Sequence, residues 1–429
     1  MSAPPTIPAE LTNVACPFCG LVCDDLVVGT DAGRLAVQAN GCAVAVAGFA
    51  RASAGGGAFG ARIAGRPASL AEAAAEAARL LRGARQPVIG GLATDVEGSR
   101  AAGRLADRCG GVLDHMNTAA AIRNIRVLQD TGWITTTLSE IRNRADLLIA
   151  VGGDIVSRFP RFFERCIVNS DTLFSEQRRC EVIFLGGGSA PDGLKLPGGA
   201  PTVIACEIPR LYEVFGVLRA LVAGRPISAE SAAGVPIATL RALAERMKAA
   251  KYGVMAWAAP DFDFAHAELT VQGLCELVKD LNRDTRFSGL PLGGTDGDVT
   301  SDAVHLWQSG FGARTSYGQG VPEHDSYHYA TARMLERGET DALLWISSFN
   351  PARVPPSSTV PPIVLAGEGM VFEREPAVFI PIGTPGVDHA GHLFRTDRVV
   401  ALPLQRLRAS ALPSAAEVLT AIDAAFGEA

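Results

Sequence analysis

Residues 145–154 read ADLLIAVGGD, and residues 340–348 read TDALLWISS. Each stretch contains an acidic residue, then an unbroken apolar run, and then small residues. An apolar run without alternation is typical of a parallel β-strand that is buried on both faces. We therefore expect each stretch to be a central strand of an α/β unit. Ligands of such sheets bind beyond the carboxyl ends of the strands, where small residues let the backbone approach a phosphate.

The surrounding sequence repeats a strand–helix–strand pattern, which is the building block of a doubly wound sheet. One copy covers residues 87–89, 96–109 and 111–114, and a second covers 252–257, 265–281 and 286–292. A helix over 69–81 precedes the first copy, with Ser69 as its N-cap and Glu72 as the partner in a capping box. Further strands are predicted at 25–28, 34–37, 181–185, 363–365, 378–381 and 399–402, and a last helix near 415–426.

Length and composition indicate an ordinary globular chain of several domains. The 429 residues exceed the size at which a single hydrophobic core stops growing. The net charge of −6 argues against a nucleic-acid-binding surface. No apolar run approaches the roughly 20 residues of a membrane span, and the N-terminus lacks the pattern of a secretory signal. We therefore expect a cytoplasmic protein without a membrane partner, in which thiols stay reduced.

The sequence predicts an α/β fold made of a small cysteine-rich module and two related doubly wound units. The predicted divisions begin with a proline-rich arm at 1–13 and a cysteine-rich module of the iron–sulfur type at 14–66. A first α/β unit follows at 67–250 and 300–360, with a second α/β segment, a strand–helix–strand, at 251–299. C-terminal strands and a helix occupy 361–429.

Four of the nine cysteines form a motif with the spacing C-x2-C-x3-C-x18-C, at Cys16, Cys19, Cys23 and Cys42. In a reducing compartment such cysteines are metal ligands or buried thiols rather than disulfides. Four thiolates at this spacing favour a [4Fe–4S] cluster. A tetrahedral zinc site and a vestigial, empty site are the alternatives.

The histidines are weaker candidates for a functional site. His115 follows a predicted strand and could face a pocket, but a structural role is the more frequent one for a single histidine. His324, His328, His389 and His392 stand in loop-like sequence, and only the first two have the i,i+4 spacing that places two ligands together on a helix. We predict no metal site there.

Several motifs resemble the B subunit of the formylmethanofuran dehydrogenase family. They are CPFCGLVCDD at 16–25, the stretch from Leu128 to Asp146, WQSGF at 307–311, and residues 391–397. The resemblance covers most of the chain in the family's order and implies the molybdopterin oxidoreductase fold. In that family this subunit carries a molybdenum or tungsten centre held by two pterin guanine dinucleotides, together with a [4Fe–4S] cluster, and interconverts carbon dioxide and formate.

The chain departs from the family at the metal centre. The resemblance places the family's metal-ligating cysteine or selenocysteine near Ala120, followed by His and Gly-Pro, but residues 117–124 read NTAAAIRN. A thiolate holds the metal and tunes its potential, and an alanine methyl does neither. Some members of the superfamily, such as arsenite oxidases, keep an active centre with alanine there, so the missing His and Gly-Pro strengthen the argument.

A second departure concerns the pterin site. The family's strand-end Gly-x-Asn-Pro reads Gly152-Gly153-Asp154-Ile155 here, so we expect only a remnant of the cofactor site at Gly152, Gly153 and Asp154. The Asp154 carboxylate is unfavourable beside a dinucleotide phosphate unless a cation compensates. Arg158 and Arg161 are the candidate cations.

A paralogous family explains both departures. The formyltransferase/hydrolase complex of aerobic methylotrophs has subunits A to D, moves formyl groups from tetrahydromethanopterin to a methylofuran carrier, and hydrolyses them to formate without a redox step. The resemblance to its B subunit implies a non-redox structural role beside subunits A, C and D and a methylofuran-type carrier. It implies no molybdopterin and no catalytic residue in this chain, with a [4Fe–4S] cluster either present or vestigial. The alternatives are an active molybdenum or tungsten formylmethanofuran (formate) dehydrogenase subunit and an iron–sulfur electron-transfer subunit.

Overall fold

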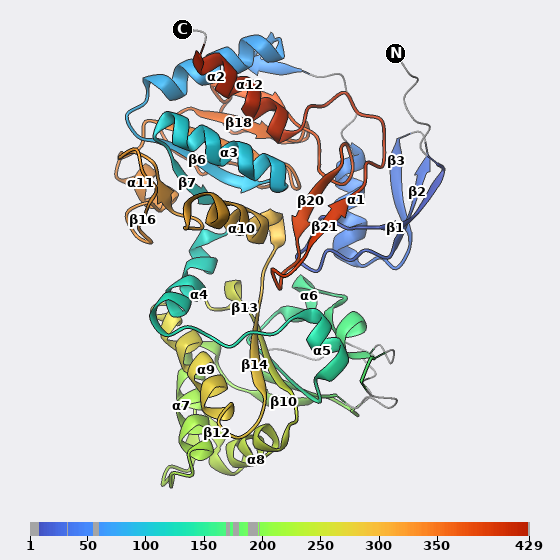
Figure 1. The fold of residues 1–429 in the computed structure, drawn as a ribbon, viewed down its shortest axis with the longest axis vertical. Coiled ribbons are helices and arrows are strands. Elements are labelled where there is room, and N and C mark those ends of the chain that lie inside the picture. Colours follow the sequence, from blue (N-terminus) through green and yellow to red (C-terminus); the bar gives the residue numbers. More distant parts are fainter. Residues whose placement is uncertain are drawn as a thin grey trace. The chain divides into compact units, whose positions relative to one another are not determined.

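The computed structural model describes residues 8–31, 33–54, 60–168, 172–174, 180–187, 196 and 198–427. The chain forms two compact units (Figure 1). The central unit is Ala119–Gly293, and the split unit comprises Met1–Thr118 and Gly294–Ala429. Among the described residues, no helix is long and apolar enough to cross a membrane.

The described part of the central unit contains a five-stranded sheet in which all neighbouring strands are parallel. Its strands are β8 (Leu147–Val151), β9 (Glu181–Gly186), β10 (Thr202–Ala205), β13 (Gly253–Ala258) and β14 (Phe287–Leu292). They lie in the order β10-β9-β8-β13-β14, so the direction of winding reverses between β8 and β13. Ligands of doubly wound sheets bind at the carboxyl ends of the strands on either side of such a reversal.

Helices α7 (Leu211–Val222), α8 (Ile237–Ala249) and α9 (Ala267–Leu281) supply much of the core of the central unit. Their apolar residues recur at helical spacing and pack with side chains of the sheet, including Ile149 and Trp257. The core of this unit contains only its own residues.

The split unit is built on a nine-stranded mixed sheet in the order β16-β15-β7-β6-β17-β18-β19-β4-β5, counted over its described residues. Five neighbouring strands in the middle are parallel: β7 (Val112–His115), β6 (Pro87–Ala93), β17 (Ala342–Ser347), β18 (Pro362–Ala366) and β19 (Val378–Pro381). The antiparallel edges are β15 (Thr315–Ser316) with β16 (Glu323–His324), and β4 (Ala61–Ile63) with β5 (Arg66–Ala68). Winding reverses between β6 and β17, so this sheet is doubly wound as well.

Both faces of this second sheet are buried. Leu344 and Ile346 of β17 pack with α2 (Leu70–Gly83), α3 (Val96–Cys109) and α12 (Ala415–Gly427). Their neighbours Leu343 and Trp345 point to the other face and join a separate core cluster with Met334. The unbroken apolar run at 342–347 therefore has the burial on two faces that its sequence predicted.

The remaining described elements connect these layers. A three-stranded antiparallel sheet of β1 (Glu10–Val14), β2 (Leu26–Asp31) and β3 (Arg34–Ala39) precedes α1 (Ala43–Ala54). Two short pairs are β11 (Ser231–Ala232) with β12 (Val235–Pro236), and β20 (Gly391–Phe394) with β21 (Ala401–Leu404). The other helices are α4 (Thr118–Thr131), α5 (Leu138–Arg144), α6 (Ile155–Arg158), α10 (Asp298–Ser309), α11 (Thr331–Glu336), a π-helix (Glu164–Val168) and 3-10 turns at Ile208–Arg210, Ala259–Asp261 and Thr295–Gly297.

The two units divide the chain at positions different from the predicted ones. Strands β13 and β14 pair into the sheet of β8, so residues 251–293 belong with the segment before them. Strand β17 pairs with β6 and β18, so residues 300–360 belong with both the N-terminal and the C-terminal segments. Within the predicted arm at 1–13, residues 1–7 lie outside the described part, and Glu10 begins β1.

Candidate functional site

The N-terminal segment brings the four cysteines of the predicted motif together. Cys16, Cys19 and Cys23 are buried in the loop between β1 and β2, and Cys42 immediately precedes α1. The Cys16 amide donates to the Cys23 carbonyl at 2.8 Å, and the Val22 amide donates to the Cys19 carbonyl at 3.1 Å. The loop therefore folds back on itself and gathers its thiols.

These thiols influence one another electrostatically. Burial raises the pKa of Cys16 far above its usual range and that of Cys19 to about 12, and repulsion from Cys23 and Cys42 raises both further. A cationic group that binds them as thiolates would relieve this repulsion. Among the described residues, no group of three or more His, Cys, Asp or Glu side chains is placed to hold a metal ion. A [4Fe–4S] cluster takes one thiolate per iron, and the four cysteines match it in number and type.

The position where the sequence resemblance predicts a lost metal ligand, Ala120, lies at the start of α4. Ala120 is in the first turn of this helix, which begins three residues after the end of β7 at His115. Ala119 is exposed, and Ala120 and Ala121 are half-buried. The side chains of these three residues in the turn are methyl groups.

A buried ionic network surrounds the end of β7. His115 Nε2 lies 3.4 Å from Asp302 Oδ1, and both side chains are almost fully buried. The Asn117 amide donates to His115 Nδ1 at 3.2 Å, which leaves the proton of the neutral ring on Nε2, facing Asp302. Burial lowers the pKa of His115, but the nearby carboxylates, Asp302 first, outweigh burial and raise it. Burial by itself would raise the pKa of Asp302, but the neighbouring His115 outweighs it and lowers that pKa to about 2. Burial lowers the pKa of His305 in the same network to about 4.

The turn before α4 is held by hydrogen bonds between Asn117 and other residues of the split unit. Asn117 donates from Nδ2 to the Thr295 carbonyl at 2.9 Å and to Asp298 Oδ2 at 3.0 Å. Its Oδ1 accepts from Arg353 Nη2 at 2.6 Å, and Arg353 Nε lies 3.1 Å from Asp296 Oδ2. The polar groups that lead into the alanine turn are therefore bonded to one another. This arrangement suits a structural role for His115, because its partners lie within the chain.

The residues predicted to be a remnant of a pterin site lie at the carboxyl end of β8. Gly152, Gly153 and Asp154 follow Val151, the last residue of that strand. The Gly153 and Asp154 amides both donate to Asp261 Oδ2 at 2.9 Å. Asp261 ends the 3-10 turn that follows β13, the neighbouring strand across the reversal of winding.

The two arginines expected to neutralise Asp154 have other partners. Arg158 Nε donates to Asp261 Oδ1 at 3.3 Å. Arg161 is buried and forms an ion pair with Glu164 at 2.6 Å. The interpretation that they compensate the charge of Asp154 therefore has no contact to support it among the described residues.

A cavity of about 210 Å³ lies at the carboxyl ends of β17, β18 and β19 in the split unit, with Ser348, Gly367 and Ile382 among its lining residues. Its polar wall is a buried ion pair in which Arg408 Nε donates to Asp388 Oδ1 at 2.7 Å. Ser348 Oγ is buried and has no hydrogen-bond partner within the described residues. The cavity can hold a small polar ligand but brings no nucleophile–base pair together.

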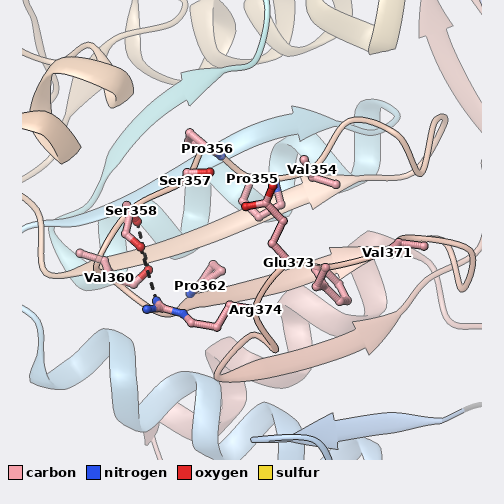
Figure 2. Close-up of a pocket in the computed structure, with 11 residues that line it drawn as sticks. Val354, Pro355, Pro356, Ser357, Ser358, Val360, Pro362, Val371, Glu373 and Arg374 are labelled. Carbon is pink, nitrogen blue, oxygen red and sulfur yellow. Dashed lines mark hydrogen bonds between the residues drawn. The ribbon is translucent and has the colours of Figure 1, made fainter.

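A second pocket, of about 260 Å³, is lined by Val354–Ser358, Val360, Pro362 and Val371–Arg374. Figure 2 shows Arg374 reaching across it, where its Nη2 donates to the Ser358 carbonyl at 3.4 Å. Most of the labelled lining is proline, valine and serine. Pro362 is the first residue of β18, so this pocket lies toward the amino end of that strand, away from the edge where ligands of such sheets bind.

The remaining histidines do not form a metal site within the described residues. His324 stacks on Phe311 and places Nδ1 3.0 Å from the Ala313 carbonyl. The His328 amide is bonded to Asp325, and His392 is exposed in β20. His389 Nδ1 is 2.9 Å from the Ala390 carbonyl.

Comparisons with known proteins agree on one group of relatives, although no family model matches the sequence. The B subunit of a tungsten-containing formylmethanofuran dehydrogenase of Methanocaldococcus jannaschii is 26% identical over 90% of this chain and 91% of its own length. The B subunit of the formyltransferase/hydrolase complex of Methylorubrum extorquens is 29% identical over 78% of this chain and 88% of its own. This chain is similar to those B subunits over most of its length.

Solved structures support the fold of this chain. The formyltransferase/hydrolase complex of Methylorubrum extorquens, solved with methylofuran, superposes with a TM-score of 0.73 at 28% identity and covers 86% of this chain and 99% of the matched chain. Acetylene hydratase of Pelobacter acetylenicus superposes with a TM-score of 0.62 at 10% identity over 97% of this chain and 69% of its own, which shows the fold alone. The predicted molybdopterin oxidoreductase-like α/β fold is confirmed.

The sequence did not single out several residues that organise these sites. Asp298, Asp302 and His305 stand four and three residues apart on α10, and this polar spacing in a buried helix was the available signal. Asp261 and Arg353 gave no such signal, because each acts on residues distant in the sequence.

Proposed function

We propose that this chain is a non-redox structural B subunit of a formyltransferase/hydrolase complex in tetrahydromethanopterin-linked one-carbon oxidation to formate. Its homologues support the coarser statement that it is a subunit of a one-carbon complex. In this role it positions subunits A, C and D and helps to guide a methylofuran-type carrier between their sites. The solved relative was crystallised as a four-component complex with methylofuran, which supports this assignment of partners.

One observation carries the non-redox part of the proposal. The first turn of α4 has Ala119, Ala120 and Ala121 at the position where the family's metal ligand is expected. No sulfur, carboxylate or imidazole occurs in residues 117–124. A molybdenum or tungsten centre there would lack the protein ligand that holds it and sets its potential.

Metal analysis of the intact complex tests the proposal. The complex is purified without chelators, and molybdenum and tungsten are measured by mass spectrometry against protein concentration. We expect both far below one atom per chain, and no dye-linked oxidation of formate or formylmethanofuran. Stoichiometric molybdenum or tungsten, accompanied by that activity, would refute the structural role and establish the dehydrogenase alternative.

A second candidate function, electron transfer, is favoured by the four gathered cysteines alone. It requires an iron–sulfur cluster that changes oxidation state. Anaerobically purified complex would then absorb broadly near 400 nm, lose that absorbance with dithionite, and contain iron and acid-labile sulfide in equal amounts. A colourless, iron-free complex ends this alternative and leaves the cysteine module as a structural remnant.

A further inference from the structure

The carboxyl ends of β8 and β13 are the place in the central unit where a doubly wound sheet offers a ligand site. The two strands are parallel neighbours in register from Leu147 and Gly253 to Val151 and Trp257. The order of strands reverses between them, so the loops that follow them diverge to opposite faces of the sheet. In such folds the crevice between these loops takes the phosphates of a nucleotide.

The crevice is occupied by a carboxylate of the chain itself. Asp261 Oδ2 accepts hydrogen bonds from the Gly153 and Asp154 amides, both at 2.9 Å. Its other oxygen, Oδ1, accepts from Arg158 Nε at 3.3 Å. The Asp261 side chain is only 3% exposed.

The donor set is the one that recognises a phosphate. Two successive backbone amides that converge on one oxygen form an anion-binding nest, and a guanidinium on the second oxygen completes it. Gly152 lets the anion approach, since its φ is +103° and a Cβ there would stand 3.0 Å from Asp261 Oδ2. The loop therefore has the backbone of an anion site, with Asp261 as the anion.

We propose that Asp261 is an internal plug, which fills the anion site at the switch point of the central unit and thereby keeps a dinucleotide phosphate out of it. A phosphate would have to displace a buried carboxylate from three donors and would then lie beside two negative charges, those of Asp154 and Asp261. The inference deepens the proposed function, because it gives a physical reason why this strand end would bind no pterin dinucleotide.

The test opens the site by removing the plug. Asp261→Ala is made in the full-length chain, and its thermal unfolding midpoint is measured in chloride and in inorganic phosphate or pyrophosphate at equal ionic strength. We expect a lower midpoint in chloride, because two amides and a guanidinium lose their acceptor. Millimolar phosphate should restore much of the loss by binding the vacated donors, with an affinity at least about tenfold above that of the wild type.

Asp146→Ala is the matched control. Asp146 also accepts from two backbone amides, those of Lys251 at 2.8 Å and Tyr252 at 3.0 Å, but at the amino ends of β8 and β13. A general stabilising effect of phosphate would raise both variants equally. Rescue of Asp261→Ala alone supports the plug, and an equal response of the two variants overturns it.

A milder variant keeps the test usable if Asp261→Ala does not fold. Asp261→Asn retains the shape and one acceptor oxygen but loses the charge, so phosphate should compete with it more successfully than with the wild type. A phosphate response equal to that of the wild type would again overturn the plug. These outcomes are independent of the metal analysis, since molybdenum in the wild-type complex would refute the structural role without bearing on the phosphate response of the variants.

Discussion

His115 and Asp302 form a deeply buried pair at the end of β7, which is an ion pair when the ring is protonated. Both groups are withdrawn from water, and each changes the other's pKa. A buried pair contributes little compared with two apolar residues, but losing one partner leaves the other charge uncompensated. The segment that contains His115, just before α4, therefore depends for its stability on Asp302 of α10.

Asp302→Asn tests this requirement. We expect a loss of roughly 3–5 kcal/mol in the free energy of unfolding, measured in urea at pH 7, because a buried pair is broken. The His115 pKa should fall from above 6.5 to below it, because burial then acts with less opposition. Histidine proton shifts followed by NMR as a function of pH measure this directly, and the signals of exposed His266 should be the same in both proteins.

The sign of the pH dependence follows from the two pKa shifts. The raised pKa of His115 contributes stability below pH 6.5, which is lost as pH rises through the folded-state pKa. The pKa of Asp302, about 2 against an ordinary 3.8, contributes stability above pH 3.8 that is lost as pH falls toward 2. Asp302→Asn should remove the dependence due to Asp302 and reverse that due to His115, because a folded-state pKa below 6.5 makes stability fall as pH falls. A variant whose stability follows the wild type across pH 3–9 would contradict the pairing.

Single residues with a local signature could be predicted, and those defined by a distant partner could not. The cysteine motif, the glycines after β8 and the alanines of α4 are visible as patterns in adjacent residues. Asp261 lies in a turn with no unusual neighbours, and its role comes from amides more than a hundred positions earlier. Arg158 is close in sequence to Asp154, but its guanidinium is bonded to Asp261, a partner that adjacent residues do not indicate.

For helices and strands, capping residues and the spacing of apolar residues predicted several of the observed elements. The predicted helix at 96–109 is α3 with the same bounds, because Asp95 caps its start and Gly110 ends it in a left-handed conformation. The capping box predicted for Ser69 and Glu72 is present at the start of α2. Short edge strands such as β15 and β11 were not predicted, since two residues carry too little periodicity to indicate a strand.

Helices α2 and α12 each begin with a capping box, so the same substitution can be compared in both. Ser69 caps α2 with Glu72, Ser414 caps α12 with Glu417 in the same way, and the two helices share one core cluster. Ser69→Ala and Ser414→Ala should each lower the free energy of unfolding by about 1 kcal/mol in urea. Ser69→Asp should keep most of the stability, because a carboxylate also accepts from the third amide of a helix. A loss in the aspartate variant as large as in the alanine variant would contradict the capping role.

For the whole molecule, the sequence predicted two related α/β sheets but not how the chain divides between them. The division depends on which strands pair, and β17 pairs with β6 although about 250 residues separate them in sequence. Apolar runs look alike in both sheets, so a run alone does not say which sheet it joins. Each unit nevertheless has hydrophobic core clusters that contain only its own residues.

Because their cores are separate, the two units should unfold in distinguishable steps. Leu274→Ala empties a buried site in the core of the central unit, and Leu344→Ala does the same in the split unit. Each should cost about 2–5 kcal/mol in the unit that contains it. Pulsed hydrogen exchange in rising urea, read by mass spectrometry of peptides from 119–293 and from the flanking segments, assigns each loss to a unit. Leu274→Ala should shift the urea midpoint of the central peptides more than that of the others, and Leu344→Ala should do the reverse. If both variants shift all peptides by the same amount, the chain unfolds as one cooperative body, and the separation of the two cores carries no thermodynamic independence.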